Sequence, residues 1–384
     1  MKFVLFYHSL ISDWNHGNAH FLRGVVSELL ERGHDVDVYE PEQGWSLSNL
    51  LADKGPAAVD EFHAAFPELR SHRYDPATLD LDQALDDADV VIVHEWNEPE
   101  WIARVGEHAA RLGCTVLFHD THHRSVTDAQ TMSSLDLRNY AGVLAFGKAV
   151  ADRYAEGGWA RRAWVWHEAA DLRRFYPLPR TEQTDEAGGD VVWIGNWGDG
   201  ERSTELYEFL IRPVARLNLR ATIHGVRYPG EALDTLREAR IDYAGWIANY
   251  RVPSVFARYR CTVHVPRRMY AEQLHGVPTI RMFEALACGI PLISAPWYDD
   301  EHLFRPGVDY LVATDGAQME RDLKAVLHEP ELAASLVKHG LETIRDRHSC
   351  AHRVAELLTI VESLRPRARP VPAQASRAPA GGQI

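Results

Sequence analysis

The chain has 384 residues, 46% of them hydrophobic and 25% charged, which is the composition of a globular protein with enough length for two cores. The net charge of −14 disfavours a nucleic acid partner, and no apolar run approaches the roughly 20 residues of a membrane span, so stable membrane insertion is not expected. The four cysteines form no CxxC pair, which favours a cytoplasmic location.

The first part of the chain alternates apolar runs with amphipathic segments. Residues 3–7 are predicted to form a strand, residues 19–32 a helix and residues 36–39 the next strand, so a parallel sheet with covering helices is expected. Residues 43–85 carry helical patches and turns, which we interpret as an elaboration of the same domain. The later predicted elements are strands at 90–93, 115–118, 142–146 and 164–166 and helices at 99–112 and 150–156. Residues 1–176 therefore predict a first Rossmann-like domain.

A second α/β pattern follows the polar segment 177–190, which is typical of a linker. Its predicted elements are strands at 191–195, 221–224, 261–265, 292–294 and 310–312 and helices at 204–217, 252–259, 280–288, 319–328 and 331–347. Residues 191–348 thus predict a second Rossmann-like domain. Residues 349–364 predict a last helix, for which a return to the first domain is one arrangement. Residues 365–384, rich in Pro, Ala and Arg, are predicted to be disordered.

Residues 278–296 contain the most informative helix of the second domain. Thr279 is placed to cap its first turn, and Gly289 to end it. Arg281 and Glu284 share the helix face opposite its apolar stripe. A helix that begins beside a parallel sheet with one carboxylate among small residues suits the sugar and phosphates of a nucleotide.

Together these stretches resemble the two-domain GT-B glycosyltransferases, most closely the retaining "glycosyl transferases group 1" family and its CgeB-like, spore-maturation-type branch. Residues 282–294 resemble the signature Glu-Ala-Met-Ala-x-Gly-x-Pro-Val-Ile, and residues 166–177 resemble Gly-Val-Asp-x-x-x-Phe-x-Pro. The resemblance implies two Rossmann-like domains that face each other across a cleft. It also implies sugar transfer from a nucleotide-diphosphate donor, with retention and with no metal ion or other cofactor. The acceptor, whether glycan, protein or small molecule, stays open.

One position departs from the family pattern. The family carries a Glu-x7-Glu pair, and Gly276 stands where the first Glu is expected if Glu284 is the second. The stereochemical outcome and the donor sugar therefore stay open. Two alternatives also remain, a nucleotide-sugar epimerase of the same architecture and a non-catalytic nucleotide- or glycan-binding module.

Donor-binding candidates lie in the second domain. Glu284 is expected to accept hydrogen bonds from ribose hydroxyls, with a simple i,i+3 pair to Arg281 as the alternative. Replacing Glu284 with Ala should then weaken nucleotide binding without changing the fold. Arg281 is expected to orient Glu284 or to meet a phosphate.

The loop from Gly195 to Arg202 contains three glycines that let backbone N–H groups approach an anion. Asn196 stands where the family carries Arg, so Arg202 is the candidate cation, and an ordinary turn with a surface Arg is the alternative. Trp246 and Ile247 resemble a base-contacting segment of the family, although core packing explains Trp246 equally well.

First-domain candidates follow the ends of predicted strands. Gly17 and Asn18 resemble the family's donor-phosphate loop, and His16 is a candidate general base for an inverting enzyme, or else an ordinary loop histidine. His119 and Asp120 lie in a His-rich run whose spacing matches no usual zinc motif, so no metal site is expected. By resemblance, His119 reaches the donor sugar and Asp120 orients it or neighbours the acceptor.

Glu95 follows the strand at 90–93 and precedes Trp96. A carboxylate next to an aromatic ring suits a sugar, so Glu95 is an acceptor-site candidate, with a plain polar loop as the alternative.

Overall fold

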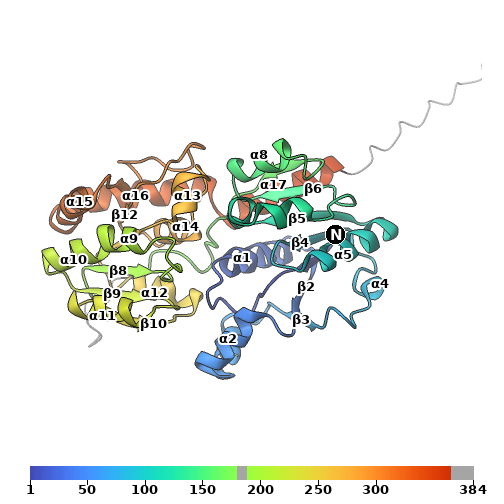
Figure 1. Cartoon of the computed structure of the whole chain (residues 1–384), viewed down its shortest axis with the longest axis horizontal. Helices are drawn as coiled ribbons and strands as arrows, with labels where there is room; N and C mark the ends of the chain where they lie inside the picture. Colours follow the sequence, from blue (N-terminus) through green and yellow to red (C-terminus); the bar gives the residue numbers. More distant parts are fainter. Residues whose placement is uncertain (180–187, 365–384) are drawn as a thin grey trace, which may run out of the picture.

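The computed structural model describes residues 1–179 and 188–364, which form two α/β domains (Figure 1). Each domain is built on one parallel sheet, with the strand orders β3-β2-β1-β4-β5-β6-β7 and β10-β9-β8-β11-β12-β13. This confirms the predicted fold class. Residues 180–187 of the predicted linker and the predicted tail at 365–384 lie outside the described residues.

The N-terminal sheet has apolar central strands that are buried on both faces, as parallel strands covered by helices must be. Its strands are β1 (Lys2–Phe6), β2 (Asp35–Pro41), β3 (Ser71–Tyr74), β4 (Val90–His94), β5 (Thr115–Asp120), β6 (Gly142–Ala145) and β7 (Ala163–Val165). Its helices are α1 (Asn18–Glu31), α2 (Trp45–Lys54), α3 (Ala57–Ala65), α4 (Leu81–Ala84), α5 (Pro99–Leu112), α6 (Arg124–Thr127), α7 (Ala129–Ser134) and α8 (Lys148–Glu156).

The elaboration at residues 43–85 contains an edge strand that the sequence pattern did not predict. Strand β3 reads Ser-His-Arg-Tyr and pairs with β2 at the sheet edge. An edge strand with exposed polar side chains shows no apolar alternation, which is the signal used to recognise strands.

The C-terminal domain contains the predicted strands in the predicted order and adds an edge strand at 242–245 and helices at 230–238 and 268–272, which the sequence pattern did not predict. Its strands are β8 (Val191–Ile194), β9 (Ala221–His224), β10 (Asp242–Gly245), β11 (Cys261–His264), β12 (Leu292–Ser294) and β13 (Leu311–Val312). Its helices are α9 (Ser203–Leu206), α10 (Arg212–Leu217), α11 (Gly230–Glu238), α12 (Val252–Phe256), α13 (Arg268–Glu272), α14 (Ile280–Ala287), α15 (Gly316–His328) and α16 (Pro330–Arg347), with a 3₁₀ turn at Asn249–Arg251.

The predicted helix at 204–217 is interrupted by a π-helical turn at Tyr207–Ile211. Pro213 has no N–H to donate, and the N–H of Arg212 bonds to the carbonyl of Tyr207, five residues back. The proline therefore explains the change in hydrogen-bond register.

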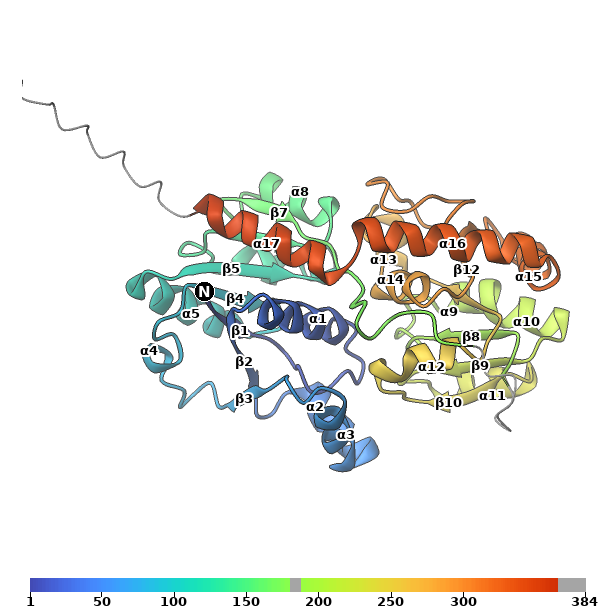
Figure 2. The same ribbon diagram turned by 180° about the vertical axis from the view of Figure 1, so that it is seen from behind.

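Helix α17 (Cys350–Leu364) lies on the N-terminal domain, beside α1 (Figure 2). The N–H of Ala170 donates to the carbonyl of His348 at 3.0 Å, and the N–H of Cys350 donates to the carbonyl of Ala170 at 3.0 Å. Gly24 permits the close approach, because a Cβ there would lie 2.4 Å from the Sγ of Cys350. The chain thus crosses between the domains twice.

Candidate active site

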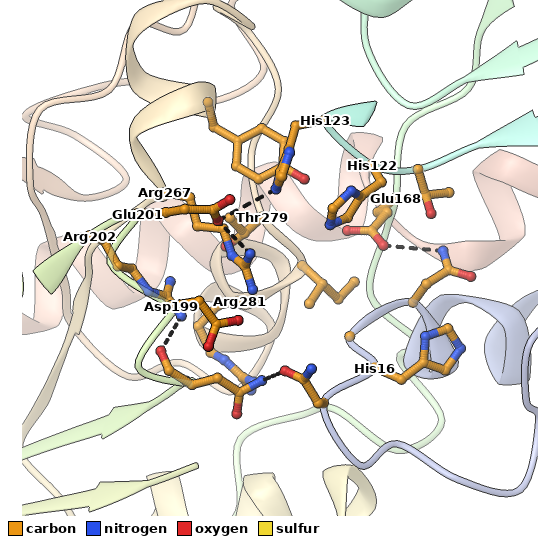
Figure 3. Close-up of a pocket in the computed structure, with 18 of the residues that line it drawn as sticks. His16, His122, His123, Glu168, Asp199, Glu201, Arg202, Arg267, Thr279 and Arg281 are labelled. Atoms are coloured by element: carbon orange, nitrogen blue, oxygen red, sulfur yellow. Dashed lines mark hydrogen bonds and ion pairs between the residues drawn. The ribbon is translucent and has the colours of Figure 1, made fainter. Parts of the chain in front are cut away.

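A cleft of about 510 Å³ lies between the two domains, at the carboxyl ends of both sheets (Figure 3). Its lining residues lie within segments 15–18, 121–123 and 168 of the N-terminal domain and segments 194–202, 267–270 and 279–281 of the C-terminal domain, with single residues from neighbouring loops. These segments follow β1, β5, β7, β8 and β11 or begin α14. Open parallel sheets bind ligands where the strand order reverses, which here is between β1 and β4 and between β8 and β11.

The C-terminal wall is rich in arginine. Its charged lining residues are Arg202, Arg227, Arg267 and Arg281, together with Asp199 and Glu201. Cations therefore outnumber carboxylates on this wall, which suits an anionic group such as a diphosphate.

Arg202 belongs to this wall but is largely occupied by the protein. It is buried, and it donates to the carbonyls of Val265 at 3.0 Å and Asn196 at 2.5 Å. Its guanidinium carbon lies 5.1 Å from the ring centroid of Trp193. Burial, aided by Arg267, lowers the pKa of Arg202 to about 10, so it remains charged at neutral pH. Arg202 thus fixes the loop as well as contributing charge.

Arg267 and Arg281 both point into the cleft in Figure 3. Arg267 pairs with Glu201 at 2.5 Å, and the Nε2 of His123 lies 3.6 Å from the same carboxylate. Arg281 pairs with Glu284, and its Nε has no hydrogen-bond partner within the described ranges. Arg267 was not predicted from the sequence, although its position after the strand at 261–265 is a signal that could have found it.

Glu284 does not line the cleft but lies behind Arg281 with no exposed surface. It accepts hydrogen bonds from the Nδ1–H of His20 at 2.8 Å and from Asn249 at 2.5 Å. The N–H of Asp171 donates to the Nε2 of His20 at 2.9 Å, which leaves Nδ1 to donate to Glu284. Burial alone would raise the pKa of Glu284, but Arg281 and His20 overcome it and lower that pKa. The contact between Glu284 and a ribose stays a prediction. Both carboxylate oxygens of Glu284 accept hydrogen bonds from protein side chains in this structure.

Thr279 occupies the N-cap position of α14 as predicted, but its side chain makes no capping hydrogen bond. Its hydroxyl lies 3.1 Å from the Nε2 of His264 instead. The predicted capping contact is therefore wrong, because a buried histidine is the nearer partner.

The loop after β1 brings its predicted residues to the cleft. A Cβ on Gly17 would lie 3.3 Å from the Cγ2 of Ile280, so this loop closely approaches the start of α14. His16 lies on the wall, and its buried Nε2 has no partner among the described side chains. Burial lowers the pKa of His16 well below the usual value, which keeps the imidazole neutral and makes it a weaker base than a solvated histidine. Asn196, next to Gly195 on the opposite wall, donates to Asn15 across the cleft.

His119 and Asp120 do not reach the wall, although both were predicted to act there. Strand β5 continues to Asp120, two residues beyond its predicted end, so both side chains are enclosed by the layers that cover the sheet. His119 hydrogen-bonds to the hydroxyl of Tyr7 at 2.6 Å, and Asp120 accepts from the hydroxyl of Tyr154 at 2.8 Å.

The residues from this run that do line the cleft are Thr121, His122 and His123, none of which was a site candidate from the sequence. In the part of the chain that the structure describes, no group of three or more His, Cys, Asp or Glu side chains is arranged to hold a metal ion.

Glu95 also lies behind the wall, with no exposed surface and no hydrogen-bond partner for either oxygen among residues 1–179 and 188–364. Burial and the neighbouring Asp120 raise the pKa of Glu95 well above the usual value, against the guanidinium of Arg124, whose Nη1 lies 3.8 Å from a Glu95 carboxylate oxygen. Its neighbour Trp96 lines the cleft and is 37% exposed. The loop that the sequence pointed to thus reaches the cleft through Trp96, and the acceptor role of Glu95 stays a prediction.

Trp246 and Ile247 line a smaller cavity that adjoins the cleft and shares His16 and Arg281 with it. The indole N–H of Trp246 donates to Asp13 of the N-terminal domain at 3.2 Å. Their predicted contact with a nucleotide base stays a prediction.

Position 276 has no room for the absent glutamate. Gly276 has a φ of +80°, and a Cβ there would lie 2.8 Å from the Cγ of Glu301. A side chain at 276 is thus opposed both by backbone conformation and by contact.

Glu168 is a carboxyl group on the cleft wall that sequence reasoning missed. It lies in the loop after β7, inside the segment that was interpreted only as closing the first domain. It is 6% exposed, and the amide of Asn18 donates to it at 3.2 Å.

A family model described as "Glycosyl transferase-like" matches residues 202–359, so the C-terminal half carries a glycosyltransferase-like sequence. No curated protein matches the chain significantly. Among solved structures, Anabaena HepE in complex with UDP and glucose is similar with a TM-score of 0.68 and 14% identity, over 95% of this chain and 100% of that one.

Sucrose-phosphate synthase from Thermosynechococcus elongatus has a TM-score of 0.66 and 14% identity, over 95% of this chain and 99% of that one. An α-glucosyltransferase in complex with UDP has a TM-score of 0.65 and 12% identity, over 94% of this chain and 100% of that one. The chain therefore has the GT-B fold. Within the described residues, no helix is long and apolar enough to cross a membrane.

Proposed function

We propose that the protein is a glycosyltransferase that moves a sugar from a nucleotide-diphosphate donor to an acceptor. One observation carries this proposal: an arginine-rich wall of the C-terminal domain faces polar and aromatic side chains of the N-terminal domain across a single cleft. The glycosyl transferase-like match to residues 202–359 supports it. UDP-sugars are the first donors to test, because HepE was solved with UDP-glucose and the α-glucosyltransferase with UDP.

In this mechanism the departing diphosphate lies against Arg267 and Arg281 and the first turn of α14. Guanidinium groups and helix N-terminal N–H groups stabilise the negative charge that develops as the glycosidic bond breaks. These groups supply the positive charge without a metal ion, so we infer a metal-independent reaction. The walls exclude water, which would otherwise hydrolyse the donor.

We infer that the reaction retains configuration, with the leaving phosphate taking the proton of the acceptor. Glu168 supports this inference, because its environment raises its pKa to about 8 and leaves it a poor base at neutral pH. If the enzyme inverts, His16 is the better base candidate, since Asp120 lies behind the wall. The CgeB-like branch and the cytoplasmic location stay predictions from the sequence.

The test is release of free nucleotide from UDP-, GDP-, ADP- and dTDP-sugars, with and without acceptors, preceded by a thermal-shift screen of the same donors. We expect one nucleotide class to raise the melting temperature and its sugar to be consumed in an acceptor-dependent way. A non-catalytic binding module is the second candidate, favoured by the lack of room for a carboxylate at Gly276. Binding without release of nucleotide would establish that alternative. Formation of an epimer of the donor sugar would instead establish a nucleotide-sugar epimerase.

A further inference from the structure

Glu168 has an environment that favours the neutral form of its carboxyl group. It is 6% exposed, and it accepts a hydrogen bond at 3.2 Å from the amide of Asn18, which is an uncharged donor. Across the described residues, no Lys, Arg or His forms an ion pair with it, although four arginines line the opposite wall of the same cleft. A buried carboxyl group without a cation partner is more stable when protonated.

The groups that face Glu168 supply no positive charge. They are Asn18 from α1, Tyr270 from α13, the ionised Glu284 from α14 and His122 from the loop after β5. The preceding residue, His167, pairs with Glu301 at 3.0 Å instead of with Glu168. Burial first, and then the charge of Glu284, raise the pKa of Glu168 to about 8, against the opposing effect of the Asn18 hydrogen bond.

Its position in the cleft indicates what such an acid would contact. Figure 3 shows Glu168 and His122 on the side of the cleft opposite Arg202 and Arg267. If the diphosphate lies against the arginines, the wall that carries Glu168 faces the sugar. A protonated carboxyl group has one O–H to donate, and a sugar presents hydroxyl oxygens that accept.

We propose that Glu168 contacts the substrate as a neutral carboxylic acid, donating a hydrogen bond from its O–H to a hydroxyl of the transferred sugar while Asn18 holds its other oxygen. This inference rests on the proposed glycosyl transfer. No proton leaves Glu168 in the reaction, so the residue positions the sugar and is not an acid or base. Ionisation would remove the O–H donor that this contact uses.

The test compares Glu168→Gln and Glu168→Ala with the wild type, using nucleotide release from the donor that the wild type accepts, over pH 6 to 9.5. The Gln side chain donates a hydrogen bond without ionising. The Ala side chain can neither donate a hydrogen bond nor ionise. We expect kcat/KM of the wild type to fall above about pH 8, approaching tenfold per pH unit, because one group ionises. Glu168→Gln should stay within about fivefold of the wild type near pH 7 and lack that fall, and Glu168→Ala should lose roughly tenfold or more throughout.

Controls separate the possible failures. The exposed Glu272→Gln change should leave the wild-type profile intact, and melting temperatures should show that all variants are folded. If Glu168→Gln is as impaired as Glu168→Ala, the ionised carboxylate is needed and the inference is wrong, while the proposed function stands. If both variants match the wild type, Glu168 does not contact the sugar. If the wild type releases no nucleotide from any donor, the proposed function fails and the sugar contact fails with it.

Discussion

Replacing Glu284 with Ala would remove the acceptor that His20, Asn249 and Arg281 share. The carboxylate has no exposed surface, and its hydrogen bonds from His20 and Asn249 measure 2.8 and 2.5 Å. Removing it leaves the donors of His20 and Asn249 unpaired, at about 1–3 kcal/mol each, whereas Arg281, with its side chain 18% exposed, keeps access to the cleft. Since domains are stable by only about 5–15 kcal/mol, this is a large fraction of the total.

We therefore expect Glu284→Ala to lower the free energy of unfolding by about 2–6 kcal/mol and the melting temperature by roughly 10 °C. The sequence predicted weaker nucleotide binding with the fold intact, and the structure adds this loss of stability. The measurement is urea unfolding followed by tryptophan fluorescence, with Glu238→Ala, at an exposed site, as the control. A loss below about 1 kcal/mol would refute the reasoning, because that is the size expected for a surface pair.

A double-mutant cycle with His20 tests whether this cluster joins the two domains. His20 is on α1 of the N-terminal domain, and Glu284 is on α14 of the C-terminal domain. We expect a coupling energy of about 0.5–3 kcal/mol between Glu284→Gln and His20→Gln, since the two side chains are in direct contact. Strict additivity would show that the contact does not couple the domains in solution.

Three further predictions follow from the same geometry. Gly276→Ala should lower the unfolding free energy by about 1–3 kcal/mol in urea, because the left-handed backbone disfavours a side chain and the new Cβ would meet Glu301. Arg267→Ala should weaken UDP binding by roughly 10- to 100-fold in calorimetry, whereas Arg237→Ala on α11, with its side chain 75% exposed, should not.

The third prediction concerns how stability depends on pH. The pKa of Glu168 is raised from 4.5 to about 8 on folding, so between these pH values the folded state binds a proton that the unfolded state has lost. Stability should then fall with rising pH across that window, by up to about 1.4 kcal/mol per pH unit, and Glu168→Gln should remove this slope.

The sequence predicted most of the fold because the central strands are apolar runs separated by amphipathic helices. It did not predict β3, whose polar edge sequence lacks that pattern. At the site, it located the loops correctly, since strand ends can be read from apolar runs, but it did not always identify the side chain that lines the cleft. His119 and Asp120 illustrate the reason: two more residues in β5 move the start of the loop to Thr121, and the cleft is lined by Thr121, His122 and His123.

Glu168 was missed for a different physical reason. A carboxyl group acquires its neutral state from burial and from the absence of a neighbouring cation, and both depend on residues far away in the chain. Asn18 and Glu284, which set its environment, lie 150 residues before it and 116 residues after it. No local pattern carries that information.

The return of α17 to the N-terminal domain has a consequence for how the protein is made. Residues 350–364 leave the ribosome after the whole C-terminal domain, yet they cover α1, which is among the first elements synthesised. The indole N–H of Trp166 donates to the carbonyl of Arg353 at 2.8 Å, so this hydrogen bond also forms only after α17 has been synthesised. The N-terminal domain thus completes its core only after the C-terminal domain has been translated, and the face of α1 that α17 covers stays open until then.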